Sequence, residues 1–438
     1  MKASRRSRTV SPDSRAPTPA APERGGFRRF FSELGPGLIT GAADDDPSGI
    51  STYSVAGATF GYLPLWTALF SFPLMAAVQL MCARLGLVTG LGLAGVIRRR
   101  YSRWVLWSAC ALLILANVIN IAADLGGMAE ATTMVSGLPV PLSVPLYGGL
   151  IVALLMWSSY RQIARVFKWL TLVLLAYAIT AFVAHTDWRL AVRATIVPHV
   201  EWSRSFLSVL VAILGTTISP YLFFWQAAQE VEEERAMGRN LSRRRGATPD
   251  ELAACRTDVV TGMFASNAVM YFIILTTAAT LHAHGQTQIG TAKDAAEALR
   301  PLAGAGAYWL FTVGLIGTGM LAVPVLAGSC AYAIAEAAAW RGSLNRRPRG
   351  AKGFYVVLTV AMVLGIALNY AGLNAIKLLF TAAVVNGVLA PPLILIVLLL
   401  TRDRTVMGDA VNPPLVAFMG WIAFIVMVVA ALGLFLTT

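Results

Sequence analysis

The feature that most constrains this chain is a series of apolar runs, each about 20 residues long. A helix of that length and composition crosses the hydrocarbon core of a bilayer. The chain has 438 residues, of which 57% are hydrophobic and 13% are charged, whereas an ordinary soluble domain has about 25% charged residues. The runs lack the alternation typical of an outer-membrane β-barrel. The sequence therefore predicts an all-α polytopic membrane protein.

We expect about eleven transmembrane helices, an odd number that puts the two termini on opposite sides of the membrane. Of the 35 Lys and Arg residues, 28 lie in the N-terminal tail or in the loops predicted on the same side of the membrane as the tail. Five lie in the loops predicted on the opposite side. Because positive charge marks the cytoplasmic side, we predict a cytoplasmic N-terminus and an outer C-terminus. The predicted spans are 35–62, 64–90, 104–127, 142–158, 165–185, 205–229, 257–281, 306–336, 353–371, 374–400 and 413–436.

The net charge of +13 then reflects loops that face lipid headgroups, so we expect a lipid bilayer and no nucleic acid as partner. Residues 1–28 are rich in Arg, Ser and Pro and predict a disordered basic cytoplasmic tail. Residues 29–400 form the predicted helical core, and residues 401–438 a loop with the eleventh helix. The connection Glu230 to Arg256 mixes acidic and basic runs and predicts a solvated cytoplasmic segment. The Ala- and Arg-rich composition favours a bacterial inner (plasma) membrane.

The first span is interrupted by three consecutive carboxylates, Asp44, Asp45 and Asp46, followed by Pro47. Each Asp at the middle of a membrane costs about 2.5–3.5 kcal/mol on insertion scales, and such residues are functional by default. Proline removes a backbone donor, and the nearby Gly49 adopts dihedrals that other residues avoid. We therefore expect two half-helices joined by an unwound acidic link, which suits a cation.

A second interruption lies in the sixth span, at Gly215-Thr216-Thr217-Ile218-Ser219-Pro220-Tyr221. Interrupted spans at matching positions of two opposed halves indicate an inverted-repeat transporter with its site near the midplane. We expect these halves at about 35–185 and 205–400. The alternative for the sixth span alone is a simple proline kink.

The third span carries Asn117, Asn120 and Asp124, which share one helix face. A polar stripe on a membrane helix faces the bundle or water. It either lines a proton or ion pathway or makes hydrogen bonds between helices. In the tenth span, Asn386 is a candidate additional metal ligand.

Several short segments form a recognisable pattern: Gly35-Pro36-Gly37-Leu38, Asp46-Pro47, Phe60-Gly61-Tyr62, Trp66 and Ala122-Ala123-Asp124-Leu125. They resemble segments of the NRAMP (natural resistance-associated macrophage protein) divalent-metal transporters. The resemblance covers most of spans one to ten, and it implies a LeuT-like fold of two inverted five-helix repeats, with helices 1 and 6 broken and an extra eleventh helix, whose core, residues 29–400, would be the transporter. It also implies that Asp46 is a metal ligand and that Asp124 belongs to a proton path.

Departures from the family pattern point to its divergent branch, some members of which are magnesium transporters. The first-helix signature Asp-Pro-Gly-Asn reads Asp-Pro-Ser-Gly here, so that Gly49 replaces an Asn ligand. Ser219 stands where the family has its metal-binding Met, Tyr221 where it has His, and Ala382 where it has Gln. A thioether favours soft or borderline metals, whereas hydroxyls, carboxylates and carbonyls suit Mg²⁺, Ca²⁺ and Mn²⁺. Smaller side chains also leave room for the water that Mg²⁺ retains.

The leading hypothesis is a secondary transporter that moves a divalent cation, Mn²⁺ or Fe²⁺ or else Mg²⁺, by alternating access. Its expected ligands are Asp46, Gly49, Thr216, Ser219, Asp45 and Asn386, and its expected proton or ion path is Asp124, Asn120, Asn117 and Tyr221. Protons are a candidate co-substrate. We expect no cofactor, no obligate protein partner and no enzymatic activity. The alternative is a LeuT-fold symporter for an amino acid or other organic solute, against which the three adjacent Asp residues argue.

Overall fold

The computed structural model describes residues 35–158, 162, 172–238 and 246–437, and these residues form helices joined by turns. Nine helices in this part of the chain are long and apolar enough to cross a membrane. The predicted first span is divided into two shorter helices. The predicted fifth span, 165–185, falls partly outside the described residues, and its described part is the apolar segment Leu172–Val183. Together these segments account for the eleven predicted spans. The predicted tail, 1–28, lies outside the described residues.

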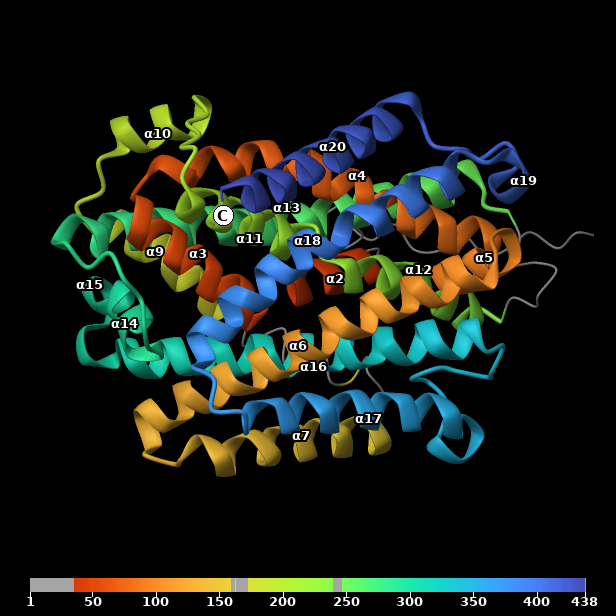
Figure 1. The fold of residues 1–438 in the computed structure, drawn as a ribbon, viewed down its shortest axis with the longest axis horizontal. Coiled ribbons are helices and arrows are strands. Elements are labelled where there is room, and N and C mark those ends of the chain that lie inside the picture. Colours follow the sequence, from red (N-terminus) through yellow and green to blue (C-terminus); the bar gives the residue numbers. More distant parts are fainter. Residues whose placement is uncertain (1–34, 159–161, 163–171, 239–245, 438) are drawn as a thin grey trace, which may run out of the picture. The chain divides into compact units, whose positions relative to one another are not determined.

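Two broken spans lie in the middle of the helix bundle (Figure 1). The first consists of α2 (Pro36–Asp44) and α3 (Pro47–Phe60), and the sixth consists of α11 (Arg204–Thr217) and α12 (Pro220–Ala236). Helix α2 packs on α13, α3 on α13 and α18, α11 on α18, and α12 on α4. The remaining long helices are α4 (Trp66–Thr89), α6 (Arg103–Ser136), α13 (Pro249–Thr280), α16 (Ala307–Ala337) and α18 (Ala375–Arg402) around the breaks, and α7 (Val140–Trp157), α17 (Lys352–Asn369) and α20 (Pro414–Leu436) farther out.

Burial explains which helices form the core. The largest fully buried side chains include Trp225, Tyr221 and Phe223 of α12 and Tyr53 of α3. By contrast, α17 and α20 expose aliphatic side chains along one side. A helix that leaves apolar side chains uncovered in a membrane protein faces lipid, because lipid is as apolar as the side chains themselves. The broken spans are therefore surrounded by protein, and the outer helices separate them from the bilayer.

Short helices occupy connections for which the sequence predicted no structure. They are α5 (Leu93–Arg100), α10 (Trp188–Ile196), α14 (Ala292–Ala296), α15 (Arg300–Ala303) and α19 (Arg404–Met407), whereas α9 (Leu175–Val183) belongs to the predicted fifth span. Figure 1 places α5 and α19 at one end of the bundle and α10, α14 and α15 at the other. This separation agrees with the predicted assignment of their loops to opposite membrane faces.

The prediction of a solvated connector from Glu230 to Arg256 is wrong at its first end, whereas most residues of its described second end, 246–256, are exposed. Helix α12 continues to Ala236, and Glu230, Glu232 and Glu234 on it are buried. Helix α13 begins at Pro249, before the predicted start of its span, because Thr248 and Glu251 form a capping box there. Runs of charge were interpreted as exposed, whereas the side chains of α12 pack against α2, α4 and α16.

Candidate metal site at the two helix breaks

The two breaks have the same local geometry. Each one is two residues long and is followed by a proline in the first turn of the second half-helix. At the first break, Asp45 has φ −81° and ψ 54°, and Asp46 is extended. At the second break, Ile218 has φ −119° and ψ 58°, and Ser219 is extended. Backbone groups that leave the helix ladder in this way become available to a ligand, since a proline cannot continue the ladder.

Asp46 is the residue that starts α3. Its Oδ1 accepts a hydrogen bond of 2.6 Å from the backbone N–H of Gly49, so the carboxylate caps the half-helix. The side chain is 3% exposed and therefore lies inside the bundle. Oδ2 lies 3.5 Å from the hydroxyl of Tyr221, a long contact at the limit of a hydrogen bond. One carboxylate oxygen is thus fixed by the helix, and the other is held only loosely.

Two tyrosines connect the breaks. Tyr221 of α12 donates a hydrogen bond of 3.1 Å to the carbonyl of Ala43, at the end of α2. Tyr53 of α3 lies beside Thr216 of α11 and within electrostatic reach of Asp46. Both rings are fully buried. The four half-helix ends therefore meet around one buried polar region.

Gly49 contributes its backbone to this region and has little free space around it. A Cβ at this position would lie 3.3 Å from the Tyr53 ring and 3.4 Å from Oδ1 of Asp46. The sequence predicts that Gly49, which lacks the Asn side chain of the family pattern, leaves room for water around the ion. The structure instead places the Tyr53 ring against this face of Gly49, so any extra room lies elsewhere.

The other two carboxylates of the first break share one partner that the sequence did not reveal. Ser266 of α13 lies 2.7 Å from Oδ2 of Asp44 and 3.1 Å from Oδ1 of Asp45. A hydroxyl has a single proton to donate, so it serves the two carboxylates alternately. Oδ1 of Asp44 has no hydrogen-bond partner among the described residues. The signal that could have found Ser266 is the polar pair Ser266-Asn267 inside an otherwise apolar run.

At the second break, the hydroxyl groups are oriented by their own helix. Thr216 donates to the carbonyl of Ile213 at 2.9 Å, and Ser219 donates to the carbonyls of Gly215 and Thr216 at 2.8 and 2.7 Å. A hydroxyl that donates its proton to a carbonyl of the preceding helical turn still has its oxygen lone pairs available. Thr216 and Ser219 can therefore act as acceptors or as neutral oxygen ligands.

Asp124 of α6 reaches the same buried region. Its polar neighbours are the carboxylate of Asp46 and the backbone of Ser48. The side chain is fully buried, and neither oxygen has a hydrogen bond of normal geometry to any described residue. Among the ion pairs of the described chain, none joins Asp44, Asp45, Asp46 or Asp124 to a basic side chain. The four carboxylates are thus gathered without a permanent counter-charge.

The structure gives the asparagines a different role from the one expected of a ligand. Asn120 and Asn386 make two reciprocal amide hydrogen bonds, at 2.9 and 3.1 Å, which join α6 to α18. Asn117 donates to the carbonyl of Leu326 on α16 at 2.8 Å, and its own oxygen has no described partner. Of the two interpretations of the polar stripe, hydrogen bonding between helices accounts for Asn117 and Asn120. No printed contact links Asn386 to the breaks, and its role as a ligand stays a prediction.

Throughout the residues that the structure describes, no group of three or more His, Cys, Asp and Glu side chains is arranged to hold a metal ion by itself, so a metal at the breaks would also need neutral oxygen ligands. One thioether lies near the breaks. Met128 is one turn beyond Asp124 on α6, and it contacts the same side of Gly319 as the ring of Pro47. The side chains that the breaks themselves contribute end in oxygen, with the aliphatic Ile218 and the prolines as exceptions.

Comparison with known proteins gives one family. The model of the natural resistance-associated macrophage protein-like family matches residues 37–437. The divalent metal cation transporter MntH of Caldanaerobacter subterraneus subsp. tengcongensis is 26% identical over 424 residues, covering 94% of both chains. The MntH of Mesorhizobium japonicum is 28% identical over 420 residues, covering 92% of this chain and 88% of that protein.

Solved structures establish the fold. The Eremococcus coleocola manganese transporter superposes with a TM-score of 0.74 at 22% identity, covering 94% of this chain and 88% of that one. Mhp1, a nucleobase-cation-symport-1 family transporter, superposes with a TM-score of 0.56 at 13% identity, covering 92% of this chain and 93% of that one. These likenesses confirm the predicted LeuT-like, all-α architecture.

Proposed function

The chain belongs to the natural resistance-associated macrophage protein (NRAMP) family, as its resemblance to that family predicted, and on this premise we propose that it carries divalent metal cations across a cell membrane. The observation that carries the proposal is the group of four buried carboxylates, Asp44, Asp45, Asp46 and Asp124, which has no basic partner in the described chain. Buried charges in proteins are paired or bind metal. The relatives named above are transporters rather than enzymes.

We place the ion near the midplane, at the two breaks. Asp46 is the principal ligand, because its Oδ2 is the loosely held oxygen and faces the second half-helix pair. Thr216 and Ser219 supply neutral oxygens, and the backbone at Gly49 and the carboxylate of Asp45 lie within the same region. Asn386 is retained as an outer ligand only for a state in which its pair with Asn120 opens.

The proposed substrate is a hard or borderline ion, Mg²⁺ or Mn²⁺, with Fe²⁺ as the family's other choice. The oxygen side chains of the breaks suit Mg²⁺ and Mn²⁺, since these ions prefer carboxylate, hydroxyl, carbonyl and water ligands. The names of two similar proteins agree with a divalent metal, because one is named a divalent metal cation transporter and the other a manganese transporter. Met128 is the thioether whose participation would shift the preference toward softer metals.

Alternating access is the proposed mechanism. All four carboxylates are at most 5% exposed, so an ion bound among them would have little contact with solvent in this conformation. Entry and exit then require movement of half-helices, as in other transporters with discontinuous helices. We propose a multi-pass protein of the bacterial plasma membrane, with the N-terminus inside and the C-terminus outside, on the charge distribution of its loops.

Protons are the candidate co-substrate, with Asp124 beside the ion and Tyr221 between the breaks as the nearest groups of a path. The alternative is transport driven by the membrane potential alone. A pH-sensitive dye inside proteoliposomes separates the two. Proton movement that accompanies metal uptake and is lost in Asp124→Asn supports coupling, and uptake without proton movement supports the potential-driven version.

The test of the proposed function is uptake of Mn²⁺ and Mg²⁺ into proteoliposomes. We expect Asp46→Ala to lower uptake to the level of empty liposomes, while Asp250→Ala, an exposed carboxylate on α13, retains wild-type uptake. Block of Mn²⁺ uptake by excess Mg²⁺ would identify a hard-ion site. Met128→Leu should leave the order of ions unchanged if the site uses oxygen only. Wild-type uptake by Asp46→Ala would refute the assignment.

The symporter alternative has no observation in its favour. An organic solute with a carboxylate would meet four carboxylates and no paired basic side chain at these breaks. The likeness to Mhp1 shows the fold alone. Inhibition of metal uptake by an amino acid would revive this alternative.

A further inference from the structure

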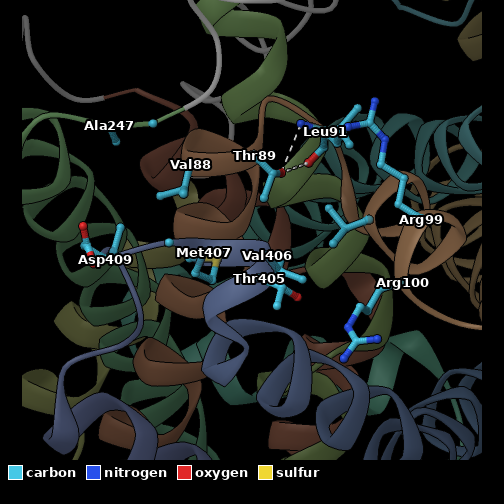
Figure 2. Close-up of a pocket in the computed structure, with 14 residues that line it drawn as sticks. Val88, Thr89, Leu91, Arg99, Arg100, Ala247, Thr405, Val406, Met407 and Asp409 are labelled. Atoms are coloured by element: carbon cyan, nitrogen blue, oxygen red, sulfur yellow. Dashed lines mark hydrogen bonds between the residues drawn. The ribbon is translucent and has the colours of Figure 1, made fainter.

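A cavity of about 630 Å³ lies away from the breaks, at the end of the bundle that carries α5 and α19. Figure 2 shows that its lining comes from the end of α4, from α5, from the connection before α13 and from α19 with the turn after it. Ligand pockets that hold small organic molecules have volumes of about 300–1,000 Å³. The cavity is thus large enough for a phospholipid headgroup with the start of its acyl chains.

Hydrogen bonds hold the walls of this cavity in place. Arg84 of α4 donates from Nη2 to the carbonyls of Ala410 and Val411, at 2.9 and 3.2 Å, and so attaches the segment after α19 to α4. The N–H of Gly246 donates to the carbonyl of Val88 at 2.7 Å and attaches the opposite wall. The cavity is therefore formed by tertiary contacts and not by a loose loop.

One side of the cavity is basic. Arg99 and Arg100, the last two residues of α5, both line it. Arg100 donates from Nε to Oδ2 of Asp403 at 2.5 Å, so its charge is already compensated. Arg99 takes part in none of the ion pairs found between described residues, and it is exposed. Asp409, the acidic residue of the lining, lies on the side away from both arginines (Figure 2).

The rest of the lining is mainly apolar and includes Val88, Leu91, Val96, Val406 and Met407. Val88 lies in the last turn of α4, and the other four residues lie beyond the ends of the spans that α4 and α18 form. A small soluble anion would contact only the basic side of the cavity. An amphiphile would contact both sides, its anionic group at the arginines and its apolar part at the apolar residues. On the positive-inside assignment, this end of the bundle meets the cytoplasmic leaflet, which carries anionic lipids.

We propose that this cavity binds an anionic phospholipid of the inner leaflet. The phosphate lies against the guanidinium of Arg99, and the first methylenes of the acyl chains lie on the wall of Val406 and Met407. An arginine suits this role because its planar fork binds phosphate through two hydrogen bonds. The site is separate from the helix breaks, so it does not depend on which ion the protein carries.

The test uses the full chain in detergent, with dioleoyl-phosphatidylglycerol added at increasing mole fraction and dioleoyl-phosphatidylcholine as the neutral lipid. Binding is followed by native mass spectrometry and by the thermal midpoint. We expect phosphatidylglycerol, and not phosphatidylcholine, to bind and to raise the midpoint. Arg99→Gln should weaken this binding about fivefold, since a basic residue near the surface contributes about 1 kcal/mol to anionic-lipid binding.

Two further variants separate the cavity from the general basic surface. Arg98→Gln removes an equal charge from the same exposed turn but does not line the cavity, and it should bind the lipid as the wild type does. Val406→Trp fills the cavity without changing any charge, and it should weaken binding as Arg99→Gln does.

Three results would overturn the proposal. Equal weakening by Arg98→Gln and Arg99→Gln would indicate diffuse attraction to a basic surface. Equal binding of the neutral lipid would show that the cavity does not select a lipid with a net negative charge. A rise in the thermal midpoint with inorganic phosphate or glycerol phosphate that matches the rise with lipid would identify a site for a soluble anion.

Discussion

The N-terminus of α2 is held by a side chain from a different helix, and this contact predicts how firmly α2 is docked on α13. Three backbone N–H groups donate to the carboxylate of Asp258 on α13: Gly35 at 2.8 Å, Gly37 at 2.6 Å and Leu38 at 3.2 Å. No side chain of the α2 segment itself caps this helix. A carboxylate at a helix N-terminus also interacts favourably with the helix dipole. Asp258 is therefore the cap of α2 and its attachment to α13.

Asp258→Asn tests this attachment with a minimal change of volume. Oδ1 accepts from Gly35 and Leu38, and Oδ2 accepts from Gly37. The amide of Asn retains one acceptor but turns an NH₂ group toward the remaining N–H. A hydrogen bond to a charged group contributes about 1.5–3 kcal/mol. Since Asp258 is 5% exposed, solvent screens this loss little, and we expect the docked state of α2 to lose about 2–3 kcal/mol.

Hydrogen exchange of the α2 amides measures that loss directly, because exchange reports the free energy of local opening. A loss of about 2–3 kcal/mol corresponds to exchange about 30- to 150-fold faster in α2, with α17 unchanged. The matched control is Asp250→Asn, which makes the same chemical change at an exposed position in the first turn of α13. Exchange in α2 at the wild-type rate in Asp258→Asn would refute the reasoning.

Three further predictions follow from other contacts. Ser266→Ala removes the hydroxyl that two carboxylates share, so metal affinity measured by titration calorimetry should fall about tenfold; unchanged affinity contradicts that role. Asn120→Ala and Asn386→Ala should each cost about 1–3 kcal/mol by leaving a buried amide unpaired, and the double variant should cost less than their sum in thermal unfolding; strict additivity argues against the pair. A hydrogen bond from Arg100 lowers the pKa of Asp403 from 3.8 to about 2. Because the folded-state pKa is the lower one, the stabilisation is complete above about pH 4 and is lost as the pH falls toward 2. The advantage in Tm of the wild type over Asp403→Asn should shrink across that interval, and an advantage that persists at pH 2 would contradict the assignment.

Most of the fold could be predicted from the sequence because a membrane helix is specified locally. Its length follows from the thickness of the bilayer and its orientation from the charge of the loops. The predicted bounds of the last span, 413–436, and the observed helix Pro414–Leu436 agree closely. The predicted helix ends are wrong where a helix continues into a polar segment, because apolar content no longer marks the helix there. The last turns of α6, to Ser136, and the acidic end of α12 are helical because other helices cover them.

The candidate site was predictable to the extent that it depends on backbone chemistry. The proline after Asp46 and the proline after Ser219 predict the two breaks, since a proline cannot continue the hydrogen bonds of a preceding helix. The partners of the carboxylates were not predictable, because they depend on which helices meet. Ser266 comes from an ordinary apolar span and Tyr53 from the second half of the broken first span, and the packing of α13 and α11 against α2 and α3 brings them together with the carboxylates and Thr216.

The way in which the carboxylates are compensated is itself an argument for a mobile cation. A structural ion pair would supply a fixed positive side chain, and such a pair keeps its charge compensated whether or not an ion is present. Here the described partners of Asp46 are a backbone N–H and a tyrosine hydroxyl, and those of Asp44 and Asp45 include one serine hydroxyl. Neutral donors reduce the cost of burying a carboxylate but do not remove its charge. A positive charge that compensates these carboxylates, a metal ion or a proton, would then come from outside the protein and could leave again, as the proposed transport site requires.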